Sequence, residues 1–389
     1  MTINGGIRTE SWSSLPARHQ PRWEDPEVIQ QIRAQLTELP VLVSRQEVGA
    51  LSGLLAEVAH GERQVLQAGD CAEDPAECTS GHVTRKAALL GRLAEVMRAR
   101  SGKPVLCVGR IAGQFGKPRS NPTENVAGQE IPVYLGHLVN GPEPDPELRR
   151  PDPKRILAGY WAASAAMDVL RDRNTRAPEY VWTSHEALLL DYELPMVRQA
   201  GDELFLSSTH WPWIGERTRQ VGGAHVDLLS AMANPVACKV GPGATVEELL
   251  ALCERLDPNG EPGRLTFIAR MGADKVAERL PALVSAVRAI RPLCIWLCDP
   301  MHGNTITGPG GRKTRRLDSM TREVTEFQTV VIGEGAVAGG LHLEATPDEV
   351  TECVSDEAGM NSLPDAYTSL CDPRLNAEQA VSVVSAWHG

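Results

Sequence analysis

The chain has 389 residues, a formal net charge of −11 at pH 7 and 42% hydrophobic residues. The acidic balance argues against general binding to nucleic acid, so clustered arginines or lysines would have to serve a local anionic ligand. No apolar run is long enough to cross a bilayer, and residues 1–10 lack the basic-then-apolar plan of a secretory signal. The nine cysteines are scattered and odd in number, which favours reduced thiols over a disulfide framework. The sequence therefore predicts a cytoplasmic protein without a membrane segment.

Residues 1–60 are predicted to form an N-terminal arm with two helices, followed by a catalytic domain over residues 61–389. Asp25-Pro26 is a helix-start signal, and the first helix should end near Thr37. A second helix is expected from about Ser44 to Ala59, with Val48, Leu51, Leu55 and Val58 on one face. This apolar face should cover one end of the following domain or a partner subunit.

From residue 64 onward, about eight short apolar runs each end in a polar or glycine-containing turn and alternate with helical sequence. The runs cover residues 65–68, 104–108, 180–182, 204–206, 236–238, 265–269, 293–298 and 338–343. Strands that alternate with helices predict an α/β fold, a (β/α)₈ TIM barrel, in which the loops after the strands form the active site. A doubly wound open sheet is the second choice, because the first strand is not followed by a dinucleotide- or phosphate-binding glycine motif.

Two loops of this pattern are candidates for substrate contacts. The segment 117–153 is longer than most barrel connections, which favours a lid or a substrate loop. The segment 308–316 is basic and glycine-rich, and it is either a solvated face or part of the site. In the turn that follows residues 293–298, Asp299 could orient His302, and Asn304 could hold a polar substrate.

In a closed barrel the strand ends would bring together Cys71, His302 and Glu344, and Asp372 could reach the same rim. A thiolate, an imidazole and two carboxylates suit a divalent transition metal. The carboxylates favour manganese or iron, and the thiolate favours cobalt or zinc. No pair has zinc-finger spacing, so each residue taken alone could also be a core cysteine, a surface histidine or a solvated acid.

A second group is cationic, because a basic residue closes or follows several of the predicted strands: Arg110, Arg217, Lys239 and Arg270. A guanidinium fork fits phosphate or carboxylate in a bidentate manner, so several cations on one rim indicate a multiply charged substrate. Alternatively, each cation pairs with a nearby acid such as Glu216 or Glu186. A metal beside a cation cluster suggests carbonyl chemistry on phosphorylated compounds.

Several motifs occur in one order from about residue 60 to the end: Gly69-Asp-Cys-Ala-Glu73, Gly109-Arg-Ile-Ala-Gly-Gln114, Lys117-Pro-Arg-Ser120, Gly215-Glu-Arg-Thr-Arg219, Asn234-Pro-Val236, Asp299-Pro-Met-His-Gly-Asn-Thr305 and Cys371-Asp-Pro-Arg-Leu-Asn376. This set resembles the type II 3-deoxy-D-arabino-heptulosonate 7-phosphate (DAHP) synthases. The resemblance implies a (β/α)₈ barrel in which phosphoenolpyruvate condenses with erythrose 4-phosphate and water, releasing phosphate. That reaction is the entrance to the shikimate pathway of aromatic biosynthesis.

The resemblance also implies roles for individual residues. The divalent metal, typically manganese or cobalt and alternatively zinc or iron, would be held by Cys71, His302, Glu344 and Asp372. Phosphoenolpyruvate would contact Arg110, Glu216, Arg217, Lys239 and Arg270, and the aldose phosphate would contact Lys117, Arg119 and Ser120. The catalytic candidates are Arg110, Glu216 and Lys239. Either Lys239 or an acid near the metal would move protons, and we expect a homo-oligomer, a dimer or larger.

The chain departs from the family pattern in two places. The path from Tyr160 to Ser184 lacks the helical insertion of the allosterically inhibited members, which predicts weak or absent feedback, as in short relatives that serve secondary metabolism. Tyr134-Leu-Gly-His137 stands where many members read close to Tyr-Arg-Gly-Asp, so an arginine and an acid are lost from the presumed lid. An amino or otherwise modified aldose phosphate is therefore an alternative substrate.

Two other classes of protein stay open. Another metal-dependent barrel enzyme, such as a class II aldolase or a phosphate-releasing hydrolase, would share the metal and the cations without using phosphoenolpyruvate. A catalytically idle barrel that regulates a partner enzyme would be indicated by missing ligands, but all four ligand types are present.

Overall fold

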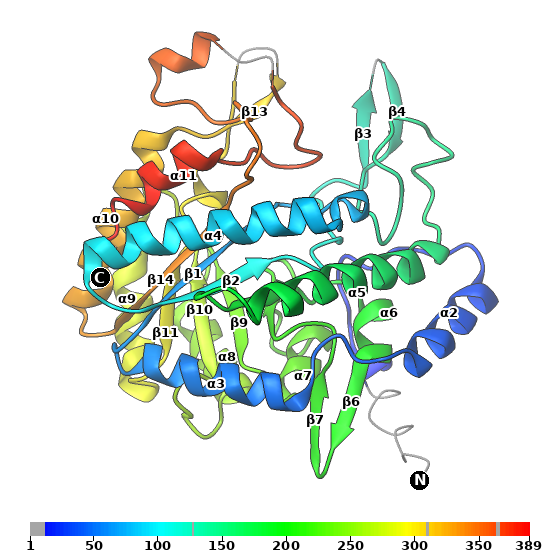
Figure 1. Ribbon diagram of the computed structural model, residues 1–389, viewed down its shortest axis with the longest axis horizontal. Helices are drawn as coiled ribbons and strands as arrows, with labels where there is room; N and C mark the ends of the chain where they lie inside the picture. Colours follow the sequence, from blue (N-terminus) through cyan, green and yellow to red (C-terminus); the bar gives the residue numbers. More distant parts are fainter. Residues whose placement is uncertain (1–11, 127, 309–310, 363–365) are drawn as a thin grey trace.

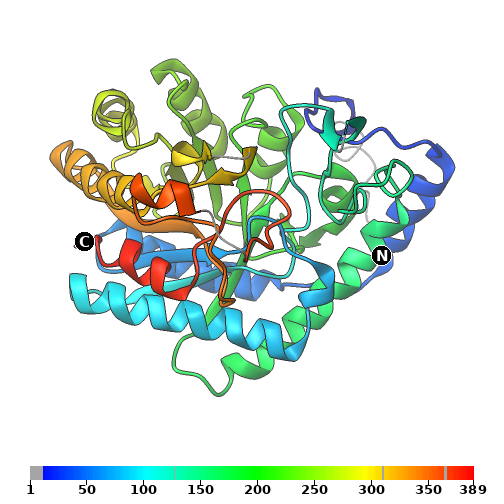
Figure 2. The same cartoon turned by 90° about the horizontal axis from the view of Figure 1, so that it is seen from above.

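The computed structural model describes residues 12–126, 128–308, 311–362 and 366–389. Within them, eight parallel strands close into a barrel with helices around it (Figures 1 and 2), which confirms the (β/α)₈ prediction over the open sheet. The strands follow one another around the barrel in chain order: β1 (Gln64–Gly69), β2 (Val105–Arg110), β5 (Val181–Glu186), β8 (Trp211–Ile214), β9 (Val236–Val240), β10 (Leu265–Ala269), β11 (Ile295–Cys298) and β14 (Val337–Glu344). β14 pairs with β1, so the barrel leaves no open edge.

The fourth barrel strand is not the one predicted. The run at 204–206 belongs to β7 (Glu203–Leu206), which pairs antiparallel with β6 (Val197–Ala200) in a hairpin outside the barrel. The barrel strand is β8, whose Trp211 and Trp213 are almost completely buried. A proline, Pro212, interrupts this run, and proline in a sequence usually argues against a central strand. The interior volume filled by two indole rings overrides that local signal.

Most of the helices lie on the outside of the barrel: α4 (Ser80–Ser101), α5 (Lys154–Asn174), α6 (Leu190–Glu193), α7 (Ala224–Ser230), α8 (Val246–Leu256), α9 (Val276–Ile290), α10 (Leu317–Gly333) and α11 (Ala377–Val384). Their buried faces and the outward side chains of the strands form a large apolar core. α8 shows how such a helix is specified. Thr245 and Glu248 form a capping box at its start, and Leu249, Leu252 and Leu256 are buried along one face.

The N-terminal helix α3 (Arg45–Ala59) closes the amino-terminal end of the barrel (Figure 1). Its Leu51, Leu55 and Val58 belong to the same apolar cluster as interior side chains such as Trp211 and Leu297. This confirms that the helix covers a barrel end. The helix α2 (Pro26–Glu38) contacts α5 and α6 instead, and the domain boundary at residue 60 stays a prediction.

The opposite end of the barrel carries long connections. The segment after β2 contains the hairpin β3 (Thr123–Val126) and β4 (Gln129–Pro132), which stands at the top of Figure 1. The buried Arg149 holds this segment together by donating to Glu124 and to the carbonyls of Pro132, Pro142 and Glu143. A second small hairpin, β12 (Ile306–Thr307) and β13 (Lys313–Thr314), follows β11. Both hairpins lie at the carboxyl ends of the barrel strands, where active sites of this fold form.

Among the described helices, none is both long and apolar enough to span a membrane. None of the nine cysteines, all of which lie in described ranges, takes part in a disulfide. The first ten residues, which are predicted from the sequence to lack a secretory signal, are outside the described residues.

Two substitutions in α3 test the role of this helix as the closure of the barrel. Leu55→Ala leaves a cavity in the interior core, and it should lower the free energy of unfolding by about 2–5 kcal/mol. The matched control is Gly53→Ala on the exposed side, where an added Cβ meets nothing within 4 Å, so that it should raise stability by about 0.5–1 kcal/mol. Urea denaturation measures both. If Leu55→Ala lowered the free energy of unfolding no more than a substitution on the exposed side, the closing role of α3 would be contradicted.

Candidate active site

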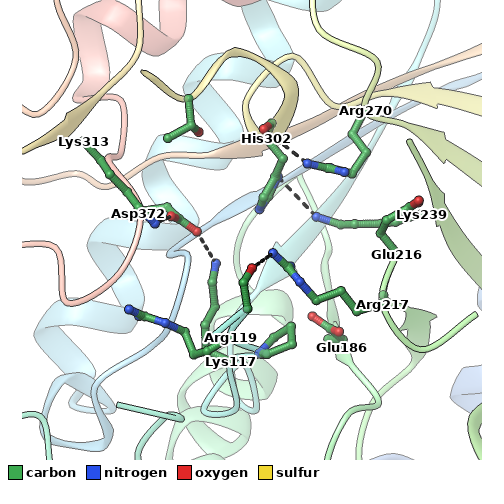
Figure 3. A pocket seen from close by; sticks show the side chains of 14 residues that line it. Lys117, Arg119, Glu186, Glu216, Arg217, Lys239, Arg270, His302, Lys313 and Asp372 are labelled. Carbon is green, nitrogen blue, oxygen red and sulfur yellow. Dashed lines mark hydrogen bonds and ion pairs between the residues drawn. The ribbon is translucent and has the colours of Figure 1, made fainter. Parts of the chain in front are cut away.

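A cavity of ≈ 220 Å³ opens at the carboxyl end of the barrel. Figure 3 shows its charged side chains converging from several loops. Its lining consists of Lys117, Pro118, Arg119, Ser120, Glu186, Gly215, Glu216, Arg217, Lys239, Arg270, His302, Thr305, Lys313 and Asp372. Most of the predicted substrate-binding residues are therefore brought together around one cavity, although they lie up to 153 positions apart in the chain, between Lys117 and Arg270.

Two of the six lysines and arginines that line the cavity, Arg217 and Arg270, make no ion pair among the described residues. The other four pair with acids: Lys117, Arg119, Lys239 and Lys313. Arg217 donates to the Ser120 hydroxyl at 2.8 Å, and Arg270 donates to the His302 carbonyl at 3.3 Å. Lys239 is buried with Nζ 3.0 Å from Asp299 Oδ2, and burial lowers its pKa while Asp299 opposes that shift. The alternative that each cation pairs with a nearby acid therefore does not hold for Arg217 and Arg270 among the described contacts.

Glu216 is committed to the protein framework. Its Oε2 accepts from the Gly241 amide at 2.6 Å, and its Oε1 accepts from Arg219 at 3.2 Å. It lines the cavity, but both oxygens already hold neighbouring loops. Glu186 differs, because its Oε1 has no hydrogen-bond partner among the described residues, and burial raises its pKa against the opposing charges of Lys239 and Lys117.

Arg110 lies beneath the cavity and not in its lining. Its side chain is buried, and its Nη2 donates to Glu344 Oε1 at 3.2 Å and to the Cys71 carbonyl at 3.3 Å. The Trp213 ring faces both Arg110 and Lys239, with ring centroid distances of 5.4 and 5.7 Å. The indole thus supports two cations with its negative face and does not neutralise either.

Three of the four predicted metal ligands form a group. Ligand atoms of His302, Glu344 and Asp372 all lie within 4.8 Å of one another. The fourth, Cys71, is adjacent, because the Asp372 amide is 3.4 Å from its Sγ. A hydrogen bond from the Cys371 thiol lowers the pKa of Cys71 to about 7, which favours the thiolate that metals bind.

The orientation of His302 fits a metal ligand. Asp299 Oδ2 lies 2.7 Å from Nδ1 of the ring, and Nε2 faces Glu344 Oε1 at 3.2 Å. A metal-binding imidazole usually donates its other N–H to a carboxylate in this way. Burial would raise the pKa of Asp299, but His302 and Lys239 hold it well below its usual range, so the carboxylate stays charged.

Lys117 joins the group to the cavity. Its Nζ lies 2.8 Å from Asp372 Oδ2 and 3.6 Å from Glu344 Oε1. Burial alone would lower the pKa of Lys117, but Asp372 and Glu344 raise it above its usual range. Burial would raise the pKa of Glu344, and His302, Lys117 and Arg315 together hold it well below. The site is therefore built from ionised groups of both signs.

Comparison with known proteins identifies the family. The model described as the class-II DAHP synthetase family matches residues 7–177 and 172–386. A probable phospho-2-dehydro-3-deoxyheptonate aldolase from Pseudomonas fluorescens is 54% identical over 379 residues, covering 95% of this chain and 94% of that protein. The chain belongs to the class II DAHP synthase family.

More distant members of the DAHP synthase family are longer. The phospho-2-dehydro-3-deoxyheptonate aldolase of Streptomyces coelicolor is 38% identical over 439 residues and AroG of Mycolicibacterium smegmatis is 37% identical over 435, with coverage of 98% and 97% of this chain and 98% and 93% of those proteins. Both alignments exceed the 389 residues of this chain, so they contain positions that it lacks. In the structure, α5 ends at Asn174 and β5 begins at Val181, which leaves a short turn where the insertion was expected to be missing.

Several residues of this DAHP synthase site were not singled out from the sequence. Arg315 is fully buried with Nη1 2.8 Å from Glu344 Oε2, and Lys313 lies 2.8 Å from Asp372 Oδ1. Both belong to the basic segment 308–316, which from its sequence could be either a solvated face or part of the site. Their positions favour the site role. Lys313 on β13 and Arg315 directly after it are separated by one residue, Thr314, so they point to the same side of an extended chain. This spacing is the signal that could have indicated the site role.

Asn304 is absent from the lining of this cavity, and its side chain is bonded to protein groups. Its amide donates to the Pro300 carbonyl and to Glu323 Oε2, and its oxygen accepts from the Ala273 amide. Glu323, on α10, also accepts from the Gly272 amide at 2.8 Å. Together they join the loop that follows Arg270 to the loop that carries His302, so the role of Asn304 is structural.

The two departures in the presumed lid lie behind the cavity. Neither Leu135 nor His137 is among its lining residues. The Leu135 carbonyl accepts from the Lys117 amide at 2.9 Å, whereas the His137 ring packs edge-on against Tyr134. Their side chains therefore do not define the walls that a substrate would touch.

Asp299→Asn tests the orientation of His302. The neutral amide holds the ring more weakly, so affinity for Mn²⁺ or Co²⁺ should fall about 10–100-fold, measured by competition with a chelator. The matched control is Asp318→Asn, an exposed acid on α10 that pairs with Arg316. Lys239→Met removes the other partner of Asp299 and should leave metal affinity within about threefold of wild type. Equal affinity in Asp299→Asn and wild type would contradict the assignment.

Proposed function

We propose that this enzyme condenses phosphoenolpyruvate with erythrose 4-phosphate and water to give DAHP and phosphate, the first step of the shikimate pathway. Membership of the DAHP synthase family supports the reaction. The observation that carries the assignment of residues is the cavity in which several cations lie beside the group His302, Glu344 and Asp372.

Cys71, His302, Glu344 and Asp372 would hold the divalent metal. The gathered donors, the thiol of lowered pKa and the Asp299-oriented imidazole all fit such an ion. The carboxylates favour manganese or iron and the thiolate favours cobalt or zinc. The resemblance to the family implies manganese or cobalt, with zinc or iron as alternatives. When bound, the metal supplies Lewis acidity toward the aldehyde oxygen of the aldose.

Phosphoenolpyruvate would bind between Arg110, Arg217, Lys239 and Arg270. Arg217 and Arg270 make no ion pair among the described residues, so their forks are available for phosphate or carboxylate oxygens. Glu216 would act by holding the loops that carry these cations, because Gly241 and Arg219 occupy its carboxylate. Fixing both reactants in this way can supply about 7–11 kcal/mol of the barrier in favourable systems.

The aldose phosphate would lie on the other side of the cavity. Lys117, Arg119 and Ser120 line that side, and Lys313 reaches it from the β12–β13 hairpin (Figure 3). A phosphate there would place the aldehyde toward Lys117 and the candidate metal group. The C3 carbon of the enol phosphate then attacks the aldehyde carbon, water adds at C2, and phosphate leaves.

Two cavity side chains are suited to move protons. Lys239 has a lowered pKa, so its ammonium can give a proton to the oxygen that was the aldehyde. Glu186 lines the cavity and has a raised pKa, so it can accept a proton from the attacking water. We propose one proton transfer for each group, in place of the single carrier, Lys239 or an acid near the metal, that the sequence suggested.

A panel of aldose phosphates tests the substrate. Metal-loaded protein is incubated with phosphoenolpyruvate and either erythrose 4-phosphate or an amino-substituted analogue, and both enol loss and phosphate release are followed. We expect consumption with erythrose 4-phosphate, in equal amounts of enol and phosphate. Consumption with the amino aldose alone would favour the alternative substrate and a secondary pathway. If phosphoenolpyruvate were not consumed in an aldose-dependent manner with any divalent metal, the synthase assignment would be contradicted.

Cys71→Ser tests the thiolate in the same assay. It should abolish metal-supported turnover, because a serine hydroxyl does not ionise near neutral pH. Cys107→Ser is the matched control, since this buried thiol faces the outer core, where its Sγ is 3.9 Å from the Leu90 carbonyl. A fully active Cys71→Ser variant would remove the thiolate from the site.

Feedback by aromatic amino acids should be weak or absent. The short turn between α5 and β5 leaves no insertion in which an inhibitor site could be built. Initial rates with saturating tryptophan, phenylalanine or tyrosine should stay within about twofold of the uninhibited rate. Strong inhibition by any of them would show that another part of the chain binds the inhibitor.

We also propose that the enzyme works in the cytoplasm as a homo-oligomer. Nine cysteines without a disulfide fit a reducing compartment. Trp161 on α5 is 56% exposed, which fits a surface that another subunit covers. Light scattering on the purified protein measures the mass directly.

A further inference from the structure

A continuous chain of hydrogen bonds runs inside the barrel below the cavity. It begins at Arg110, whose Nη1 lies 3.2 Å from His342 Nε2. His342 Nδ1 lies 2.6 Å from Gln67 Oε1, and Gln67 Nε2 lies 2.9 Å from Ser184 Oγ. Ser184 Oγ is 3.3 Å from the Gly109 carbonyl, directly before Arg110 on β2. The chain thus connects four strands and returns to the strand on which it began.

The direction of every bond follows from its first member. A guanidinium can only donate, so His342 Nε2 must accept and the ring proton must sit on Nδ1. Gln67 then accepts at Oε1 and donates from Nε2 to Ser184, whose hydroxyl donates to the Gly109 carbonyl. All the members are almost completely buried, so water cannot replace a missing partner. Only one arrangement of protons satisfies the whole chain.

The two ends of the Arg110 fork are held by different kinds of partner. Nη2 donates to Glu344 and to the Cys71 carbonyl. Among the described residues, Nη1 donates to His342. Fixing both ends sets the plane of the guanidinium. A carboxylate in the place of His342 would fix it equally well but would add a second negative charge beside a guanidinium that already pairs with Glu344. A neutral imidazole orients the cation without adding to that compensation.

We propose that His342, held by Gln67 and Ser184, is a positioning residue that aims the Arg110 guanidinium at phosphoenolpyruvate. This rests on the proposed assignment of Arg110 to that substrate. His342 touches neither substrate nor cavity, and it acts through the acceptor nitrogen that it presents to Arg110.

Two substitutions of His342 test whether the residue acts through the acceptor that it presents to Arg110. The side-chain amide of glutamine reaches as far as Nε2, so His342→Gln can still accept from Arg110. The amide of asparagine reaches only as far as Nδ1, so His342→Asn keeps the contact with Gln67 and loses Arg110. Calorimetric titration of phosphoenolpyruvate into the metal-loaded enzyme, without aldose, measures the effect. We expect affinity to fall about 10–100-fold in His342→Asn and to stay within about threefold of wild type in His342→Gln.

Asparagine is also the smaller side chain, so a packing role predicts the same order, and His342→Leu separates the two roles. Leucine nearly keeps the volume of histidine but cannot accept from Arg110, so the positioning role predicts a loss of about 10–100-fold in His342→Leu as well. Wild-type affinity in His342→Leu, or equal losses in His342→Asn and His342→Gln, would overturn the proposal. Metal affinity is measured in parallel, and a loss confined to metal binding would also overturn it. If the His342 variants do not fold, Gln67→Met removes the partner that fixes the ring with little change of volume. It should weaken phosphoenolpyruvate binding by about three- to tenfold, and no change would count against the chain.

Two further variants complete the test. Thr266→Val is the matched control, because Thr266 is fully buried in the same barrel and its hydroxyl has no hydrogen-bond partner among the described residues. It should leave binding unchanged. Arg110→Lys separates the two proposals. If it leaves phosphoenolpyruvate affinity unchanged, the assignment of Arg110 fails and the inference falls with it. If it weakens binding while His342→Asn does not, only the positioning role of His342 fails.

Discussion

The carboxylate of Glu344 is completely buried, and the site is organised by the cations that compensate its charge. Arg110 lies 3.2 Å, Lys117 3.6 Å and Arg315 2.8 Å from its oxygens, and His302 Nε2 lies at 3.2 Å. These partners come from separate strands and loops, so they meet Glu344 only when the barrel closes. A buried carboxylate that lost one of them would keep its desolvation cost without full compensation. Closure of the barrel and assembly of the site are therefore one event.

The two ends of the barrel interior divide stability and function between them. Toward the amino-terminal end, α3 and the inward side chains of the strands form a dry apolar cluster that favours folding. Toward the carboxyl end, the same inward positions carry Arg110, Lys239 and Glu344. The layer between them holds Gln67, Ser184 and His342, neutral polar groups that bond to one another and upward to Arg110. Polarity thus increases along the barrel axis. The charged layer lies on the neutral polar layer, whose side chains are hydrogen-bonded to one another.

Much of the site was predictable from residues that stand in contiguous motifs. The strand-then-polar pattern predicted the barrel, and the motif at 299–305 predicted His302 together with Asp299, which the structure places 2.7 Å apart. The prediction of the fourth strand was wrong because Pro212 argues against a strand at 211–214, although two buried tryptophans stabilise one there. Asn304 was misjudged because its partners, Glu323 and the Ala273 amide, belong to other elements. Arg315 was missed because a basic run looks the same whether it meets solvent or a buried acid.

The sequence by itself determined the fold class, the family resemblance and which residue types stand after each strand, because these depend on local periodicity and on short motifs. Only the tertiary structure decided which of those residues meet. It placed Arg110 below the cavity and not in its wall, gave both oxygens of Glu216 to the framework, and set Leu135 and His137 behind the lining. It also created the chain from Arg110 through His342 to Ser184, in which Gln67, His342 and Ser184 stand outside the quoted motifs. The physical reason is that a hydrogen bond depends on distance and direction across neighbouring strands, and closure of the barrel sets both.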